Sequence, residues 1–273
     1  MAWVLGLAVL LVAYWAWGPR WRASRRARLN QTPFPAEWRA LVRQHVPLVA
    51  RLPADLQQQL RQRMQVFIAE VPFIGCQGLE VTDAMQVVVS AQACLLLLNR
   101  PQAEFADLRQ VLLYPGPFRV RGEAVDAAGL HYARNDVLSG ESWAQGQVIL
   151  SWPDCLAGAA DPSDGVNVVV HEFAHQLDQE SGHANGAPPD ALRQRQWSPV
   201  FSQAFENIRR GFYDLPAGQQ PLFDDYALSA PAEFFACACE VFFERGADVQ
   251  ALHPQLYDQL HTYFRTDTAA WAR

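Results

Sequence analysis

The sequence predicts an α+β domain, mostly helical with a small mixed sheet, behind an N-terminal hydrophobic helix. Three observations predict this fold: an uncharged apolar run at residues 2–17, several segments with helical spacing, and a few short strand-like segments among them. The chain has 273 residues and half are hydrophobic, which is enough to bury a sizeable core. We expect an anchor at residues 1–19, a basic juxtamembrane linker at 20–35 and one domain at 36–273.

The N-terminal run reads AWVLGLAVLLVAYWAW and precedes five arginines between Arg20 and Arg28. It is slightly shorter than the roughly 20 residues of a spanning helix, but aromatic residues near its ends are typical of membrane interfaces. A cleaved signal peptide would carry its charges before the apolar run, and here they follow it. We therefore expect an uncleaved inner-membrane anchor with the domain in the cytoplasm. The alternatives are a hydrophobic helix docked on the domain and a soluble cytoplasmic protein.

Six segments are expected to be helical. Prolines interrupt the first of them, and Asp55 can cap its last part. Thr82 or Asp83 can cap the second. The helical segments are 36–70, 81–99, the stretch after a turn at 161–165, 199–211, 229–245 and 250–265.

Strands are expected in two places. Within residues 108–120, LRQVLLYPG and PFRV are short strands joined by a Pro-Gly turn. Within residues 146–154, GQVILSWPD is a strand that ends at Pro153. Residues 71–80 are expected to form a loop.

Charge and cysteine usage narrow the function classes. The net charge is −6, all 22 basic residues are arginine, and no long basic tract lies inside the domain, so nucleic-acid binding is not expected. The five cysteines include no Cys-x-x-Cys pair. Buried free thiols are therefore expected, and a cysteine-based zinc site is not.

The stretch VVVHEFAHQLDQESG, residues 168–182, carries the main chemical pattern. His171 and His175 are four residues apart, so on a helix they share one face and can present two imidazoles to Zn²⁺. Glu172 is one step round the helix, where it reaches a water molecule as a general base. Gly182 is a natural end for the helix. The alternative is an ordinary helix with two satisfied histidines.

A tetrahedral catalytic zinc site needs a third protein ligand. No histidine follows at the short downstream spacing, because His183 lies beyond the expected end of the helix. Glu233 projects from an otherwise apolar segment that Ser229 can cap, and together with the motif upstream this makes it the best third ligand. The alternative is a first-turn glutamate favoured by the helix dipole. Glu240 lies seven residues further on and is the runner-up, or a residue that supports a ligand.

Two other residues fit roles at such a site. Asp178 is three residues after His175, where a carboxylate can orient an imidazole; an exposed helix aspartate is the alternative. Tyr226 lies seven residues before Glu233, and its phenol can donate to an oxyanion; a packed aromatic is the alternative.

Three stretches together resemble the Mlc titration factor A family of zinc peptidases. They are VNVVVHEFAHQLD, a following NG.P loop and DDYALSAPAEFFA. The resemblance covers roughly residues 35–265 and includes the GQVILSW strand. HEFAHQLD is also similar to the catalytic domain of anthrax lethal factor.

The resemblance implies a zincin-like, gluzincin-type domain over residues 36–273 with one zinc ion. It also implies that an antiparallel strand, 147–152, lies beside the site and aligns an extended peptide. By the same resemblance the metal ligands are His171, His175 and Glu233, the catalytic base is Glu172, and Tyr226 occupies the matching tyrosine position.

The function expected is a zinc-dependent peptidase, with aminopeptidase-type activity implied by the resemblance. One alternative is a regulatory protein-binding module that sequesters a transcriptional repressor and whose metal site is not essential. Another is a metal hydrolase of non-peptide amides. The intact Glu172 argues against a purely structural metal. The expected partners are a peptide or protein substrate, a repressor through the resemblance, and the membrane through residues 2–17.

Overall fold

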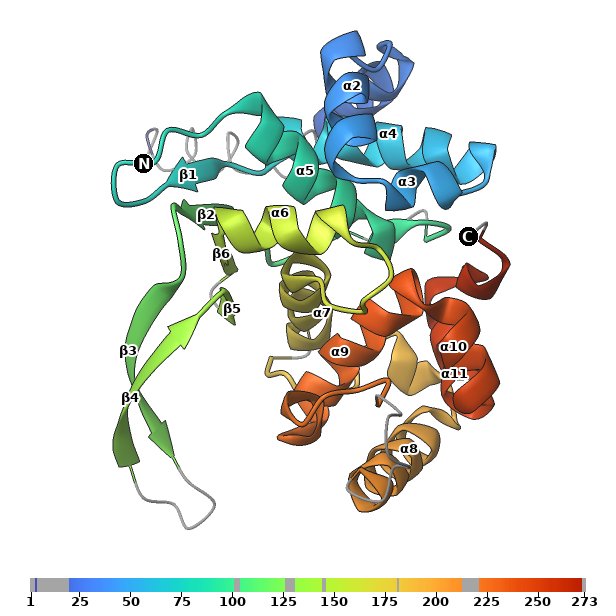
Figure 1. The fold of residues 1–273 in the computed structure, drawn as a ribbon. Helices are drawn as coiled ribbons and strands as arrows, with labels where there is room; N and C mark the ends of the chain where they lie inside the picture. Colours follow the sequence, from blue (N-terminus) through green and yellow to red (C-terminus); the bar gives the residue numbers. More distant parts are fainter. Residues whose placement is uncertain are drawn as a thin grey trace.

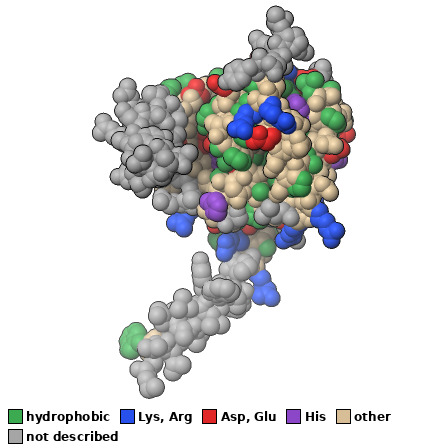
Figure 2. Space-filling view, turned by 90° about the horizontal axis from the view of Figure 1, so that it is seen from below, with side chains coloured by type: hydrophobic (Ala, Val, Ile, Leu, Met, Phe, Trp, Pro, Cys, Tyr) green, Lys and Arg blue, Asp and Glu red, His purple; other side chains and the backbone are tan. Residues whose placement is uncertain are grey.

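The computed structural model describes residues 3, 20–100, 104–125, 131–143, 146–180, 182–212 and 221–271. A small sheet lies at one side of the molecule, helices make up the rest, and one helix, α7, lies near the centre (Figure 1). This arrangement confirms the α+β class and the mixed sheet. On the face shown in Figure 2, the described arginine side chains are scattered and form no continuous patch.

The expected anchor lies outside the described residues, apart from Trp3. Among the described residues, no helix has both the length and the apolar character needed to cross a bilayer. The basic segment expected to be a linker is helical over residues 20–31 and contacts the domain. Arg26 pairs with Glu70 at 2.6 Å and with Glu104 at 2.7 Å. These ion pairs hold the segment against the end of the helix that finishes at Glu70.

The four-stranded sheet has the order β1-β2-β6-β5. The first three strands run parallel, and β5 pairs antiparallel with β6, so β5 forms one edge of the described sheet. A second pair, β3 and β4, extends away from the sheet (Figure 1). The strands are β1 (Phe73–Gly75), β2 (Gln110–Tyr114), β3 (Phe118–Val125), β4 (His131–Leu138), β5 (Gly140–Trp143) and β6 (Gln147–Ser151).

Several strand predictions need correction. The loop expected at 71–80 contains β1, which is too short to show a periodic pattern. The two strands expected within 108–120 belong to different sheets and do not pair. The strand before Pro153 ends at Ser151, because the proline lies in the first turn of a helix, where its missing N–H costs nothing.

The expected helices are present with shifted ends. Asp55 lies in the first turn of α4 and Pro53 occupies the cap position, whereas Thr82 caps α5 as predicted by accepting the Met85 N–H at 3.4 Å. Residues 250–265 fall on two helices that Pro254 separates. The helices are α2 (Ala36–His45), α3 (Leu48–Arg51), α4 (Ala54–Glu70), α5 (Asp83–Ala93), α6 (Trp152–Ala160), α7 (Val168–Gln179), α8 (Trp197–Gly211), α9 (Pro231–Glu244), α10 (Gly246–Leu252) and α11 (Pro254–Phe264).

Helix α7 is buried by its neighbours on all sides. It contacts β5 and β6 of the sheet, and it packs against α5, α6 and α9. Every residue from Val169 to Asp178 is buried, including two histidines, a glutamate, a glutamine and an aspartate. Because buried polar groups need partners, this helix requires polar partners from the elements around it.

Candidate active site

The helix of the His-Glu-x-x-His motif starts where the sequence provides a cap. Asn167 precedes α7, and its side-chain oxygen accepts the N–H of Val170 at 3.0 Å. The helix ends at Gln179, a turn before the Gly182 that was expected to end it, and Gly182 has φ of +116°. The motif residues therefore lie in the rigid central turns of a buried helix.

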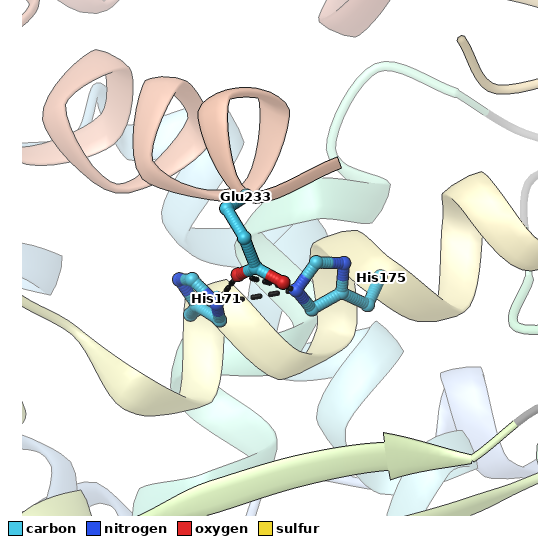
Figure 3. A group of neighbouring side chains, drawn as sticks. All are labelled: His171, His175 and Glu233. Atoms are coloured by element: carbon cyan, nitrogen blue, oxygen red, sulfur yellow. Dashed lines mark hydrogen bonds and ion pairs between the residues drawn. The ribbon is translucent and has the colours of Figure 1, made fainter. Parts of the chain in front are cut away.

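Three polar atoms converge between α7 and α9. The Nε2 atoms of His171 and His175 are 3.2 Å apart, and the Oε2 atom of Glu233 lies 3.1 Å from the first and 3.3 Å from the second. Figure 3 shows the carboxylate of Glu233 reaching from α9 to both imidazoles. The ligand atoms of these three residues form a group that could hold a metal ion.

Helix α9 brings Glu233 to this point because its first turn faces α7. The helix starts with Pro231, and Ala230 rather than Ser229 occupies the cap position. The Ser229 hydroxyl donates instead to the backbone oxygen of Tyr226 at 2.7 Å. Burial opposes ionisation of Glu233, but hydrogen bonds to both histidines outweigh burial and hold the pKa of Glu233 well below its usual range.

Glu240 lies on the other ring nitrogen of His171. Its Oε1 atom accepts from His171 Nδ1 at 2.8 Å, and its other oxygen accepts the backbone N–H of Asn167. Glu244, one turn later, accepts from the Asn167 side chain at 2.9 Å and from the Gly165 N–H at 3.2 Å. Glu240 therefore supports an imidazole, the second of the two roles that the sequence left open.

The same ring nitrogen defines a second group that could hold a metal. Cys237 Sγ lies 3.9 Å from His171 Nδ1, and with Glu240 these residues offer nitrogen, sulfur and oxygen ligands. Burial raises the pKa of the Cys237 thiol to about 12, which keeps the thiol protonated at neutral pH. In this structure the carboxylate of Glu240 already occupies the Nδ1 position.

Glu172 follows His171 on α7, one step round the helix, and its side chain lies against Gly140 of β5. Its side chain is only 6% exposed, and burial raises its pKa to about 7, although the two motif histidines act in the other direction. A cavity of about 480 Å³ opens beside it. The cavity wall includes Ser139 and Gly140 at the start of β5, His171 and Glu172 of α7, and Tyr226 and Cys237 from the α9 side.

Tyr226 lies at the mouth of the site. It begins a 3₁₀ turn (Tyr226–Leu228), half of its surface is exposed, and its ring centre is 5.9 Å from that of His171. Burial of its hydroxyl, aided by the neighbouring Glu233, raises the pKa of Tyr226. The phenol thus stays protonated at neutral pH and can donate a hydrogen bond.

Asp178 has a different role from the one the sequence suggested. It does not orient an imidazole; its carboxylate accepts the N–H groups of Asn185 and Gly186, both at 2.7 Å, and of Ala187 at 2.9 Å. A side chain on Gly186 would meet the backbone oxygen of Pro231 at 2.5 Å. Asp178 therefore holds a loop tightly against the start of α9, the helix that carries Glu233.

Comparison with known proteins identifies the family. The sequence profile described as "Glucose-regulated metallo-peptidase M90" matches residues 20–265. The chain belongs to this M90 family. The family indicates a metallopeptidase-type protein with a metal, and the two groups above are places where the described residues could hold one.

Named relatives cover almost the whole M90 chain. The uncharacterized protein slr2042 of Synechocystis sp. is 34% identical over 265 residues, which is 96% of this chain and 95% of the relative. Mlc titration factor A of Yersinia enterocolitica is 33% identical over 90% of this chain and 91% of its own length. Mlc titration factor A of Yersinia pestis is 32% identical over 92% of this chain and 90% of its own length. The resemblance to the Mlc titration factor A family is thereby confirmed.

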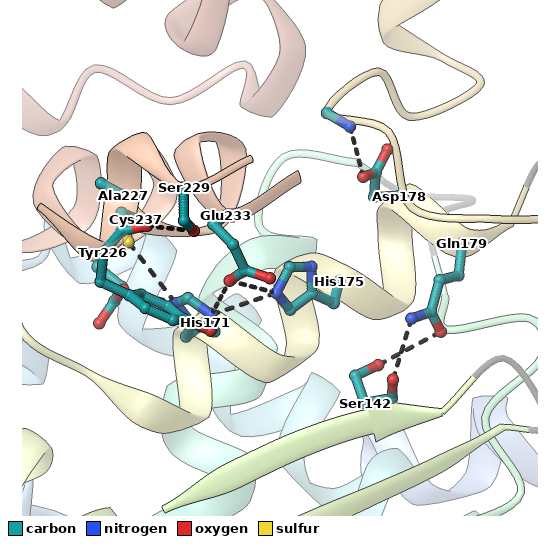
Figure 4. Close-up of polar contacts among 12 residues, drawn as sticks. Ser142, His171, His175, Asp178, Gln179, Tyr226, Ala227, Ser229, Glu233 and Cys237 are labelled. Carbon is teal, nitrogen blue, oxygen red and sulfur yellow. Dashed lines mark hydrogen bonds and ion pairs between the residues drawn. The ribbon is translucent and has the colours of Figure 1, made fainter. Parts of the chain in front are cut away.

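Sequence reasoning missed the residues of this M90 site that come from β5. The Ser142 hydroxyl accepts from Gln176 Nε2 at 2.6 Å. The Ser142 carbonyl accepts from Gln179 Nε2 at 3.1 Å (Figure 4). Gln176 is only 4% exposed, so its amide needs a buried partner. A glutamine inside a fully buried helix was the one available signal, and it did not identify the partner strand.

Proposed function

We propose that this M90 protein is a zinc-dependent peptidase whose zinc ligands are His171, His175 and Glu233. The convergence of their three ligand atoms carries the proposal. Zinc–nitrogen distances of about 2.0–2.1 Å in a tetrahedral site place ligand atoms about 3.3–3.4 Å apart. The three observed separations are 3.1, 3.2 and 3.3 Å. The donor set fits zinc, and it leaves a fourth position for a substrate or water.

The surroundings of the ligands support the same assignment. Glu240 accepts from the Nδ1 of His171, which fixes the tautomer whose Nε2 lone pair points at the metal position. His175 differs in this respect, because its Nδ1 has no hydrogen-bond partner among the described residues and no such bond fixes its tautomer. The ionised carboxylate of Glu233 contributes a negative charge that attracts a divalent cation.

The zinc ion would lower the pKa of a water molecule towards neutral and polarise the peptide carbonyl. We assign to Glu172 the removal of that water's proton and its delivery to the leaving amine. Without a metal, burial raises its pKa to about 7, and a nearby divalent cation would favour the ionised carboxylate that accepts the proton. The protonated Tyr226 hydroxyl donates a hydrogen bond to the developing oxyanion.

Strand β5 is our candidate for aligning the peptide main chain. The strand expected in this role, 147–152, corresponds to β6, which is paired on both sides by β2 and β5. β5 forms the described sheet edge next to α7, so its outward N–H and C=O groups can add an extended peptide as a further strand.

The test compares wild type with Glu172→Gln. Zinc content is measured on the purified proteins, and hydrolysis is measured on a mixed peptide library with free and with blocked N-termini. The variant should keep one zinc ion and lose about 100- to 10,000-fold in turnover, because only the base is removed. Equal turnover in both proteins would refute a peptidase with this base, and the two libraries separate aminopeptidase from endopeptidase action.

A regulatory function is the second candidate, and the names of two relatives favour it. Both are called Mlc titration factor A, and together they represent 32–33% identity over most of the chain. A module that only binds a protein would bind its partner equally well with Glu172→Gln and without zinc. A zinc-loaded protein that cleaves no peptide but binds such a partner would favour this candidate.

A further inference from the structure

We propose that Gly140 is a positioning residue that sets the place of the Glu172 carboxylate. The inference rests on the proposed function, in which Glu172 is the base. Gly140 is the first residue of β5, and it lies directly against the side chain of Glu172 across the interface between strand and helix.

The contact leaves no room for a side chain at position 140. A Cβ atom there would lie 2.5 Å from Glu172 Oε1, 2.7 Å from Glu172 Cγ and 2.7 Å from Val168 Cγ2. Such separations are far inside the usual 3.5–4.0 Å between carbon atoms. Because Glu172 is itself buried, a methyl group would have to push its carboxylate from its present position.

The strand cannot easily move back to relieve this contact. On one side, Gly140 is in register with Leu150 of β6, inside the sheet. On the other, Ser142 is bonded to Gln176 at 2.6 Å and to Gln179 at 3.1 Å, which ties β5 to α7 two residues further on. Figure 4 shows Ser142 and Gln179 bonded on the side of α7 away from Glu233.

The glycine therefore has a chemical consequence. Because Gly140 has no side chain, the Glu172 carboxylate can occupy the space beside its backbone. The same residue lines the cavity beside the site. A base acts only from hydrogen-bonding reach of the proton it removes, so its side chain must be held by packing. β5 supplies this packing, and no strand among the described residues pairs with its other edge, where we place the peptide.

The test is Gly140→Ala, with Gly116→Ala as the matched control. Gly116 lies in the turn after β2, and a Cβ there meets no atom within 4 Å. Gly140→Ala should keep its zinc and lose about 100-fold in kcat, since a misplacement of about 1 Å costs that much. The control should match wild type. Full kcat in Gly140→Ala would overturn the proposal, whereas full activity in Glu172→Gln would overturn the proposed function instead.

A rescue experiment separates positioning from loose packing. Glu172→Asp withdraws the carboxylate by one methylene, so adding Gly140→Ala to it should cost less than about threefold, a strong departure from additivity. Val168→Ala removes only the other contact and should not restore kcat. Rescue by Val168→Ala, or an undiminished cost in the aspartate background, would overturn the proposal. If Gly140→Ala melts at a lower temperature than the control, the effect of Gly140→Ala on kcat is measured again in the Val168→Ala background, where the contact with Val168 is removed.

Discussion

The two sides of helix α7 differ in the chemistry of their contacts. On the α9 side, His171 and His175 meet a carboxylate from Glu233, and charge dominates. On the β5 side, Glu172 meets a glycine, and the neighbouring bonds are between neutral groups of Ser142 and glutamines. In the proposed function, metal binding and base positioning therefore rest on separate residues, and each should be removable without the other.

The largest effect is expected from Glu233→Gln, which attacks the α9 side. A neutral amide is a poor zinc ligand, so the variant should lose zinc affinity by more than about 100-fold and lose turnover with it. Zinc titration against a chromophoric chelator measures the affinity. Glu206→Gln, on an exposed glutamate of α8 paired with Arg209 at 3.0 Å, is the control. Tight zinc binding by Glu233→Gln would contradict the assignment of the third ligand to the α9 side of the helix.

Glu240→Gln also tests the α9 side, with a smaller expected loss of zinc affinity. The variant loses the charge that fixes the His171 tautomer but keeps a group that can accept from Nδ1. Zinc affinity should fall by about 10- to 100-fold, as is typical for partners of metal-bound histidines. The chelator titration also measures this variant. A loss as large as that of Glu233→Gln would show that Glu240 is itself a ligand.

Ser142→Ala tests the β5 side. It removes the hydroxyl that accepts from Gln176, so the buried amide has one hydrogen bond fewer, which costs about 1–3 kcal/mol. The strand should loosen over Glu172, so kcat should fall about tenfold while zinc affinity stays at the wild-type value. Thr262→Ala, which removes an exposed hydroxyl bond of 2.7 Å on α11, is the control. A fall in zinc affinity would mean that the two sides are coupled.

The smallest effect on turnover is expected at Glu244, where the prediction concerns stability and pH. Burial raises the pKa of Glu244 from 4.5 to about 8, so its neutral form is favoured in the fold. Its contribution to the unfolding free energy is complete below pH 4.5 and is lost as the pH rises towards 8, by about 1.4 kcal/mol for each pH unit. Glu244→Gln should flatten the pH dependence of the unfolding free energy in this window. An unchanged pH dependence in urea unfolding would contradict this.

The motif side of the site was predictable because its geometry is local. His171, Glu172 and His175 lie on one helix, so residue spacing alone fixes their relative directions. Glu233 was predicted because the motif lacked a third ligand and this carboxylate stands in the first turn of a mostly apolar helix. The fold class followed from the same helical periodicity.

The β5 side was not predictable, because tertiary contacts create it. Gly140–Trp143 reads GESW, a four-residue segment with little strand propensity, and it becomes a strand only by pairing with β6. Asp178 was misassigned because a helix position shows which face a side chain lies on but not which loop returns to meet it. Such partners lie between seven and 37 residues away in the chain.

Zinc K-edge X-ray absorption of the zinc-loaded protein tests the central assignment most directly. We expect one zinc ion whose protein ligands are the imidazoles of His171 and His175 and the carboxylate of Glu233, at about 2.0–2.1 Å, with a water oxygen in the fourth position and no sulfur. A sulfur scatterer at about 2.3 Å would contradict this assignment, because that distance is typical of a thiolate ligand. It would place the metal instead in the group of His171, Cys237 and Glu240.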